Sequence, residues 1–414
     1  MTEMVTGPSA RDRQARIAVS AAYAVQGLCF AGVVTQVPAI KDRFDLGELH
    51  LSLILLAVPV IAGVGSVLAG VLAPKVGSAI VLRIAALGVC LGLALDGLSP
   101  SLPALYPSVA FFGLAVGAVD ATMNMQGVAV QARYGRTILN SFHAWWSVAG
   151  IVAALITSGT GAWHWPLAAA TGVVAAVGVV TIVVAGPRLV TKSEEAAATA
   201  ALPHPSGVAP AIRWWPVVLV GCAVMVMYIG ESSVSLWSGV LLKDTLAATA
   251  AVVPLGWAAY LGFQLIGRMA ADRVVGRFGV VATVAAGGLV GAVGFGLTVL
   301  AKSPALGIAG FAIVGAGLCV VVPMAFSAAG ALDPTGSGVV IARVNLFNYA
   351  GFVVGSALIG VIGESVGVRL AFGVPAALAL LIVPLAFAFR PAEAFRSAAG
   401  GVDPARSARA MAAE

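Results

Sequence analysis

The chain has 414 residues, of which 60% are hydrophobic and only 10% are charged, and its formal net charge is +6. A soluble domain carries about 25% charged residues, so this composition excludes a soluble globular protein and indicates an integral membrane protein. The positive charge is then explained by Lys and Arg residues at the cytoplasmic ends of spans, not by a nucleic-acid surface. The 4 cysteines stand singly in apolar segments, which predicts small buried side chains without disulfides.

Twelve apolar stretches are long enough to cross a ~30 Å hydrocarbon layer as helices. They lie at residues 17–40, 50–73, 79–97, 104–131, 141–161, 165–186, 214–240, 249–270, 279–301, 305–329, 340–362 and 368–390. With both termini in the cytoplasm, nearly all of the 23 Lys and Arg residues fall on that side, as the positive-inside rule requires. The exceptions are Lys41, Arg43, Lys243, Lys302 and Arg369. We therefore expect a multi-pass protein of the cell inner (plasma) membrane with cytoplasmic termini.

The polar, Ala- and Pro-rich stretch at 187–213 predicts a cytoplasmic linker. It separates an N-terminal half at 1–186 from a C-terminal half at 214–390, which is followed by a cytoplasmic tail at 391–414. The halves repeat each other, since Asn140, Phe142 and Gly150 recur at the same spacing as Asn345, Phe347 and Gly355. Parallel repeats are one way in which secondary transporters are built, with substrate sites between the halves near the midplane. Chance similarity in a Gly- and Ala-rich chain is the alternative.

Asp120 lies in the middle of an apolar stretch, from Ala104 to Val130, that holds no other charge. A carboxylate at that depth costs several kcal/mol unless it faces a protein-lined or watery cavity, which indicates a functional residue. Glu231 also lies well inside a span. A proton-driven transporter needs a carboxylate whose proton affinity changes as the cavity switches sides. We expect Asp120 first and Glu231 second to bind protons or substrate; buried structural pairs are the alternative.

Uncharged polar and aromatic residues inside the spans suit a hydroxyl-rich or amide-bearing solute. The candidates for substrate binding are Gln26, Asn124, Gln126, Tyr228, Trp237, Gln264, Asn345, Asn348 and Tyr349. Polar side chains also hold membrane helices together, which is the alternative role for many of them. His143 lies near the cytoplasmic end of the fifth span, where it either titrates or packs at a gate.

The segment from Gly267 to Gly279, with Asp272, Arg273 and Arg277, resembles the loop signature of the major facilitator superfamily between the second and third helices of each half. In the first-half copy, Pro74 stands where the acidic residue usually lies. The segments Asp120-Ala-Thr-Met-Asn124-Met-Gln126-Gly127 and Asn140-Ser-Phe-His143-Ala resemble the MosC-like branch, which sits near the fucose permeases. Members of that branch carry an Asp before the Trp of the seventh span, where this chain has Leu236.

The resemblance implies an all-α integral membrane fold of twelve transmembrane helices in two pseudo-symmetric six-helix halves. It also implies a central cavity lined by the fourth and seventh helices, and gating by His143, Asp272, Arg273 and Arg277. We expect a secondary active transporter that moves a small polar, sugar- or polyol-like solute by alternating access with proton symport. A proton-driven exporter of drug-like or amphipathic compounds is the alternative, although the fifth span lacks the Pro-containing pattern of such exporters. A transporter-like sensor is a third possibility.

No phosphate-binding loop, metal-ligand cluster or hydrolase triad spacing is present in the sequence. We therefore expect no enzyme activity, no cofactor and no metal. The expected partners are a small-molecule substrate, protons and the lipid bilayer, without nucleic acid, and the expected state is a monomer.

Overall fold

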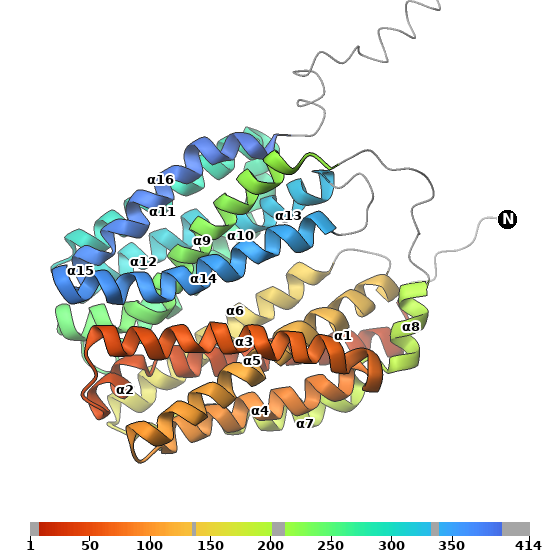
Figure 1. Cartoon of the computed structure of the whole chain (residues 1–414), viewed down its shortest axis with the longest axis horizontal. Helices are drawn as coiled ribbons and strands as arrows, with labels where there is room; N and C mark the ends of the chain where they lie inside the picture. The colour runs from red at the N-terminus through yellow and green to blue at the C-terminus, as the bar shows by residue number, and fades with distance from the viewer. Residues whose placement is uncertain (1–7, 135–137, 201–211, 333–338, 391–414) are drawn as a thin grey trace, which may run out of the picture.

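The computed structural model describes residues 8–134, 138–200, 212–332 and 339–390 (Figure 1). Within those ranges every regular element is a helix, which confirms the all-α fold. Eleven helices are long and apolar enough to cross a membrane. One more, α10 (Leu255–Phe278), has 24 residues and occupies the remaining position among the twelve expected spans. Its last three turns carry Arg268, Arg273 and Arg277, which make it less apolar than the others.

The first half of the fold holds the first six spans. Its helices are α1 (Ala10–Val34), α2 (Val37–Arg43), α3 (Glu48–Val76), α4 (Ser78–Leu98), α5 (Leu102–Tyr134), α6 (Leu139–Ala162), α7 (Leu167–Ala185), η1 (Gly186–Arg188) and α8 (Lys192–Ala200). The predicted span 17–40 is broken at Thr35 and Gln36, and the new helix α2 starts with Pro38 in its first turn. Proline is tolerated there because the first turn has no internal partner for its missing N–H.

The second half holds the other six spans. Its helices are α9 (Trp214–Val240), η2 (Leu241–Thr245), α10, α11 (Val280–Leu300), α12 (Pro304–Leu318), α13 (Val321–Leu332), α14 (Val339–Val366), α15 (Val368–Ala371), α16 (Gly373–Leu385) and η3 (Ala386–Phe389). The predicted span 305–329 is divided between α12 and α13, and the predicted span 368–390 is divided among α15, α16 and η3.

The predicted span 249–270 is placed wrongly. Pro254 caps the N-terminus of α10, and the helix continues to Phe278, where Gly279 ends it with φ of 80°. Asp272, Arg273 and Arg277 therefore belong to the last turns of a helix and not to a loop. A positive φ favours glycine, which explains why the helix stops at this residue.

The predicted linker 187–213 is not irregular throughout, because α8 lies inside it and packs against α5. Arg11 Nε and Nη2 donate hydrogen bonds to the Glu194 carboxylate of α8 at 3.0 and 2.7 Å. The Arg11 guanidinium holds the pKa of Glu194 at about 2, so this contact is charged at neutral pH. The start of the linker is thus fastened to the first half.

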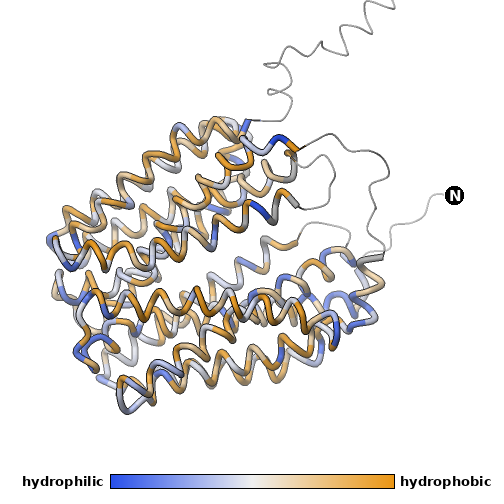
Figure 2. The backbone as a smooth tube through the Cα atoms, viewed as in Figure 1, coloured by the Kyte–Doolittle hydropathy of each residue, from blue (hydrophilic) through white to orange (hydrophobic). Residues whose placement is uncertain are grey.

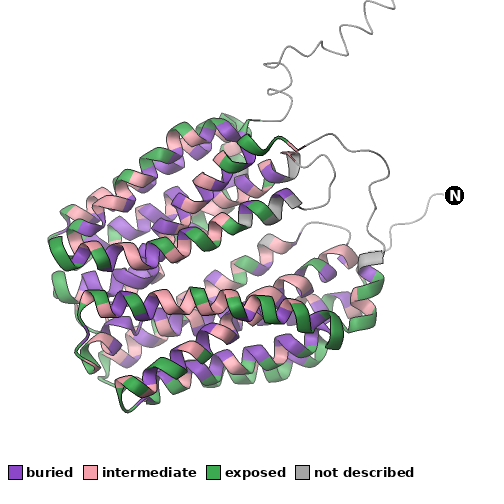
Figure 3. Cartoon of the chain, viewed as in Figure 1, coloured by how far each residue is buried: buried purple, intermediate pink, exposed green. Residues whose placement is uncertain are grey.

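The two halves converge at one end of the molecule and diverge at the other (Figure 1). We call the end where α2 and η2 lie the α2/η2 end, and the opposite one the α8 end. Hydrophobic residues cover most of each helix, with hydrophilic ones gathered toward the helix ends (Figure 2). Large apolar side chains such as Ile84, Val180 and Val293 are exposed, as contact with lipid requires (Figure 3).

Close backbone contact joins the halves through glycines. Gly360 of α14 lies so near α3 that an added Cβ would stand 1.4 Å from Ser52 Oγ and 2.6 Å from the Trp237 ring. Gly239 of α9 similarly faces Pro38 of α2, at 2.8 Å from an added Cβ. Small residues allow membrane helices to approach this closely, so the glycines permit the halves to meet.

We expect Gly360→Ala to disfavour this contact, because overpacking costs about 1–3 kcal/mol, or about tenfold in the population of the closed arrangement. Spin labels at the exposed residues Asp45 and Thr249, on different halves, would report the change as longer distances. Gly296→Ala is the matched control, since its added Cβ meets nothing within 4 Å. An unchanged distance distribution in Gly360→Ala would contradict the role of this glycine.

Candidate functional site

Asp120 lies between the two halves of the fold. It is half-buried on α5, and its Oδ2 accepts a hydrogen bond from Tyr349 OH of α14 at 3.2 Å. The Gln26 side chain of α1 also hydrogen-bonds the carboxylate. The predicted proton site is thus held by side chains from three helices, and one of those helices belongs to the opposite half.

Asn124, one turn beyond Asp120, is held in place by its neighbours. Its Nδ2 donates to the Asp120 backbone carbonyl at 2.8 Å, and its Oδ1 accepts from Tyr23 OH at 2.8 Å. The Tyr23 ring meets His143 of α6 edge-on, with ring centroids 5.1 Å apart. Asn124 therefore links the carboxylate region of α5 to α1 and, through Tyr23, to the exposed imidazole of His143.

Glu231 forms a second polar cluster within the second half. Its Oε2 accepts long hydrogen bonds from Tyr260 OH at 3.3 Å and from Gln264 Nε2 at 3.4 Å. Gln264 also donates to Tyr260 at 3.0 Å, and Trp257 stacks on Tyr260 with centroids 5.1 Å apart. Because α9 supplies Glu231 and α10 supplies its partners, this cluster joins the two helices.

Tyr228 connects the two clusters. Half-buried on α9, it interacts electrostatically with Asp120 and Tyr349 on one side and with Glu231 and Arg268 on the other. From the sequence, Arg268 is counted among the cytoplasmic charges, yet its guanidinium also interacts with Glu231 and with His143. Its spacing in the sequence could have identified Arg268 as part of the site, since it follows Gln264 by one helical turn.

Two predicted binding residues lie elsewhere. Trp237 is fully buried and donates its Nε1–H to the Ser356 carbonyl at 3.2 Å, which fixes α9 against α14. Gln126 is also fully buried, and its Nε2 donates to Ser78 Oγ at 2.7 Å and to the Val190 carbonyl at 2.9 Å. Both side chains are used in contacts between helices, so the structure does not bring either residue to the central site.

The other predicted residues are spread along two helices, α10 and α14. Asn348 is half-buried on α14 beside Tyr349, while Arg273 and Arg277 are exposed on α10. Asp272 and Asn345 belong to α10 and α14, but their side chains lie outside the described part of the chain.

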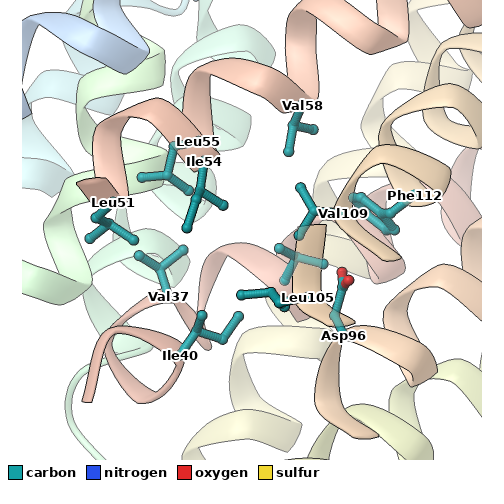
Figure 4. Close-up of a pocket in the computed structure, with 11 residues that line it drawn as sticks. Val37, Ile40, Leu51, Ile54, Leu55, Val58, Asp96, Leu105, Val109 and Phe112 are labelled. Atoms are coloured by element: carbon teal, nitrogen blue, oxygen red, sulfur yellow. The ribbon is translucent and has the colours of Figure 1, made fainter. Parts of the chain in front are cut away.

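Asp96 is a buried acid that the sequence analysis overlooks because it falls at the end of a predicted span. It is 2% exposed on α4, its Oδ1 accepts from Ser108 Oγ at 2.5 Å, and its Oδ2 has no partner among the described residues. Figure 4 shows it at one side of an apolar cavity of about 20 Å³, enough for one water molecule. The cavity lies wholly within the first half, apart from the Asp120–Glu231 site.

Charged residues join the halves at the α2/η2 end. The dipeptide Lys41-Asp42 in α2 recurs as Lys243-Asp244 in η2, and the two exchange ion pairs, Lys41 with Asp244 and Lys243 with Asp42. Lys41 also pairs with Glu48 at 2.9 Å. We call the four residues of the two dipeptides the Lys-Asp latch. It closes the same end of the molecule as Gly360 and Gly239.

Membrane-length helices in two repeated halves around a polar, carboxylate-containing centre define a membrane transporter. A sequence profile of the Major Facilitator Superfamily matches residues 19–329 and 220–408. The chain belongs to this superfamily, as the resemblance predicts.

The sequence is similar to transporters of several bacteria. It is 31% identical over 375 residues to an uncharacterised MFS-type transporter of Yersinia pestis, covering 89% of this chain and 94% of that one. It is 27% identical over 354 residues to the membrane protein MosC of Rhizobium meliloti, covering 84% of each chain. The predicted MosC-like relationship is therefore confirmed.

Solved transporter structures share the fold. A peptide transporter, POT, superposes with a TM-score of 0.70 at 14% identity, covering 90% of this chain and 93% of that one. A bacterial homologue of the human lysosomal transporter Spinster gives a TM-score of 0.67 at 12% identity, covering 92% and 97%. At such low identity the likeness establishes the fold alone.

Lys41→Met removes the Lys41–Asp244 ion pair, which joins the halves, and the Lys41–Glu48 pair, which lies within the first half. It should raise the open population at the α2/η2 end up to about fivefold, because the lost pair between the halves contributes roughly 0.2–1 kcal/mol. Spin-label distances between Asp45 and Thr249 would measure it. Raising the salt to about 1 M should open the unaltered protein in the same way and open the variant less, because the variant keeps only the Lys243–Asp42 pair of the latch. Lys302→Met, at an exposed lysine without an ion pair among the described residues, is the control; equal effects in both variants would argue against the latch.

Proposed function

We propose that the protein is a proton-coupled secondary transporter of a small polar solute of the sugar or polyol type. The solute binds between the halves, beside Asp120, Tyr228, Glu231 and Gln264. Transport proceeds by alternating access, in which the halves close around the solute first at one end and then at the other.

One observation carries the coupling proposal, namely the hydrogen bond from Tyr349 of the second half to Asp120 of the first. A carboxylate at this position has to change its surroundings whenever the halves move. Ionised, it needs the hydrogen bonds of Tyr349 and Gln26 or of water, because an unsolvated charge at membrane depth costs several kcal/mol. Protonated, it is neutral and tolerates closure of the cavity. Binding of a proton thus removes the main electrostatic obstacle to occlusion.

The uncharged side chains of the site suit hydroxyl groups. Gln26, Gln264, Tyr228 and Tyr260 offer both donors and acceptors, as a polyol requires. Trp257 and Tyr260, fully buried and stacked at 11° to each other, support Glu231 and Gln264 through the Tyr260 hydroxyl.

The orientation follows from charge. Most Lys and Arg residues fall at the α8 end or in the adjoining segments, so we place that end in the cytoplasm of a cell with the protein in its inner membrane. The α2/η2 end, with its glycine contacts and the Lys-Asp latch, is then closed toward the outside. On this assignment the structure is an inward-facing state.

Asp120→Asn keeps the shape and most hydrogen bonds of the side chain but cannot gain or lose a proton. A pH difference of one unit supports about tenfold accumulation per coupled proton, and we expect the variant to lose it while solute exchange without a gradient persists. The assay is flux into proteoliposomes, using a solute that raises the melting temperature of the purified protein in a screen of sugars and polyols.

Asp45→Asn, at an exposed acid outside the site, is the control for that assay. Gradient-driven accumulation that survives in both Asp120→Asn and Glu231→Gln would exclude coupling through these carboxylates. A screen that responds only to lipophilic cations would favour the exporter instead.

A further inference from the structure

The central site contains a positive charge that proton coupling does not use. α10 presents Trp257, Tyr260, Gln264 and Arg268 at spacings of three, four and four residues, which places all four on one face of the helix. The first three belong to the Glu231 cluster described above. Arg268 therefore extends the same face by one turn toward the α8 end.

Among the described residues, Arg268 forms no ion pair and donates no side-chain hydrogen bond. It is half-buried, and its Nε atom is buried. Glu231 lies within range of its charge, but the hydrogen bonds of Glu231 come from Tyr260 and Gln264. A guanidinium inside a membrane protein is costly unless it is paired or faces a watery cavity. The charge of Arg268 is therefore available to an anionic group that enters the site.

Side chains of both halves surround the guanidinium. Glu231 and Tyr228 on α9 interact with it from its own half, and His143 on α6 does so from the other. A group bound to Arg268 would therefore contact both halves, as a transported solute must. The planar donors of a guanidinium match the two oxygens of a carboxylate.

We propose that the transported solute carries a carboxylate and that Arg268 binds it, while the hydroxyl-bearing part of the solute lies against Tyr228 and Glu231. The solute class is thus a sugar acid or polyol acid and not a neutral sugar. This inference rests on the proposed function, since it assigns the charge of the solute at the same central site.

Matched pairs of compounds test the inference on the purified full-length protein. The pairs are glucose with glucuronate, galactose with galacturonate, and sorbitol with gluconate, each measured at pH 7.5 as a shift in melting temperature and as a Kd by calorimetry. We expect at least one acid to bind and its neutral partner to bind at least about tenfold more weakly. Arg268→Gln should weaken binding of the acid roughly ten- to hundredfold, because a charged hydrogen bond is lost.

Two further variants keep the result interpretable. Arg268→Lys retains a point charge without the planar fork, so it should restore part of the acid affinity. Lys302→Gln removes an exposed cation elsewhere and should leave the Kd unchanged. A melting temperature of Arg268→Gln close to that of the unaltered protein, without ligand, shows that the variant is folded.

Three outcomes would overturn the inference: equal binding of acid and neutral partners, acid binding that survives Arg268→Gln, or a panel in which no acid binds. Binding of neutral members with pH-dependent flux through Asp120 would leave the proposed function standing while removing the assignment of Arg268. Acid binding at Arg268 without any proton coupling would leave the assignment of Arg268 standing while removing the proposed proton coupling.

Discussion

The need to solvate charge inside a hydrocarbon layer governs the centre of this protein. Asp120, Glu231 and Arg268 all lie within membrane-length helices, and an ionised group at that depth must be paired, hydrogen-bonded or wet. The two carboxylates obtain hydrogen bonds from Tyr and Gln side chains. Because Asp120 takes one of its bonds from the opposite half, the electrostatic free energy of the site depends on how the halves are placed. That dependence is what a proton-driven conformational cycle requires.

The end of the molecule that is closed uses two different kinds of contact. Gly360 brings α14 onto α3 so tightly that an added Cβ would overlap the Ser52 side chain, so this contact depends on shape. The Lys-Asp latch lies on the surface, where ion pairs contribute little individually and are screened by salt. The Lys-Asp latch fixes the orientation of the two halves relative to each other, since both ion pairs form only when the repeated dipeptides face each other.

Hydropathy and repeats were sufficient to predict the class and arrangement of the fold, because lipid forces every span to be a long apolar helix. The α9 bounds, Trp214 and Val240, coincide with the predicted span. Helix boundaries were harder to predict, because single residues set them. Pro254 delays the start of α10, and the helix then continues past Asp272 to Phe278.

For the site, Asp120 and Glu231 stood out in the sequence as isolated charges. Trp237 and Gln126 look the same in sequence as cavity residues, and only packing distinguishes them. Arg268 was hidden by its nearness to charges that do lie at the membrane surface.

The positions of the charges also bear on how solute and proton act on each other. An anionic group bound to Arg268 cancels the one positive charge of the Asp120–Glu231–Arg268 set. The two carboxylates then repel each other and also repel the bound solute, and no positive charge of the set offsets this repulsion. Neutralising Asp120 with a proton relieves that repulsion, and a bound anion therefore favours the neutral carboxyl. Linkage is reciprocal, so protonation of Asp120 must strengthen binding of the anion by the same factor. Solute and proton would then enter the closed state together, because each removes the charge that makes occlusion costly for the other, and symport would follow from the arrangement of three side chains.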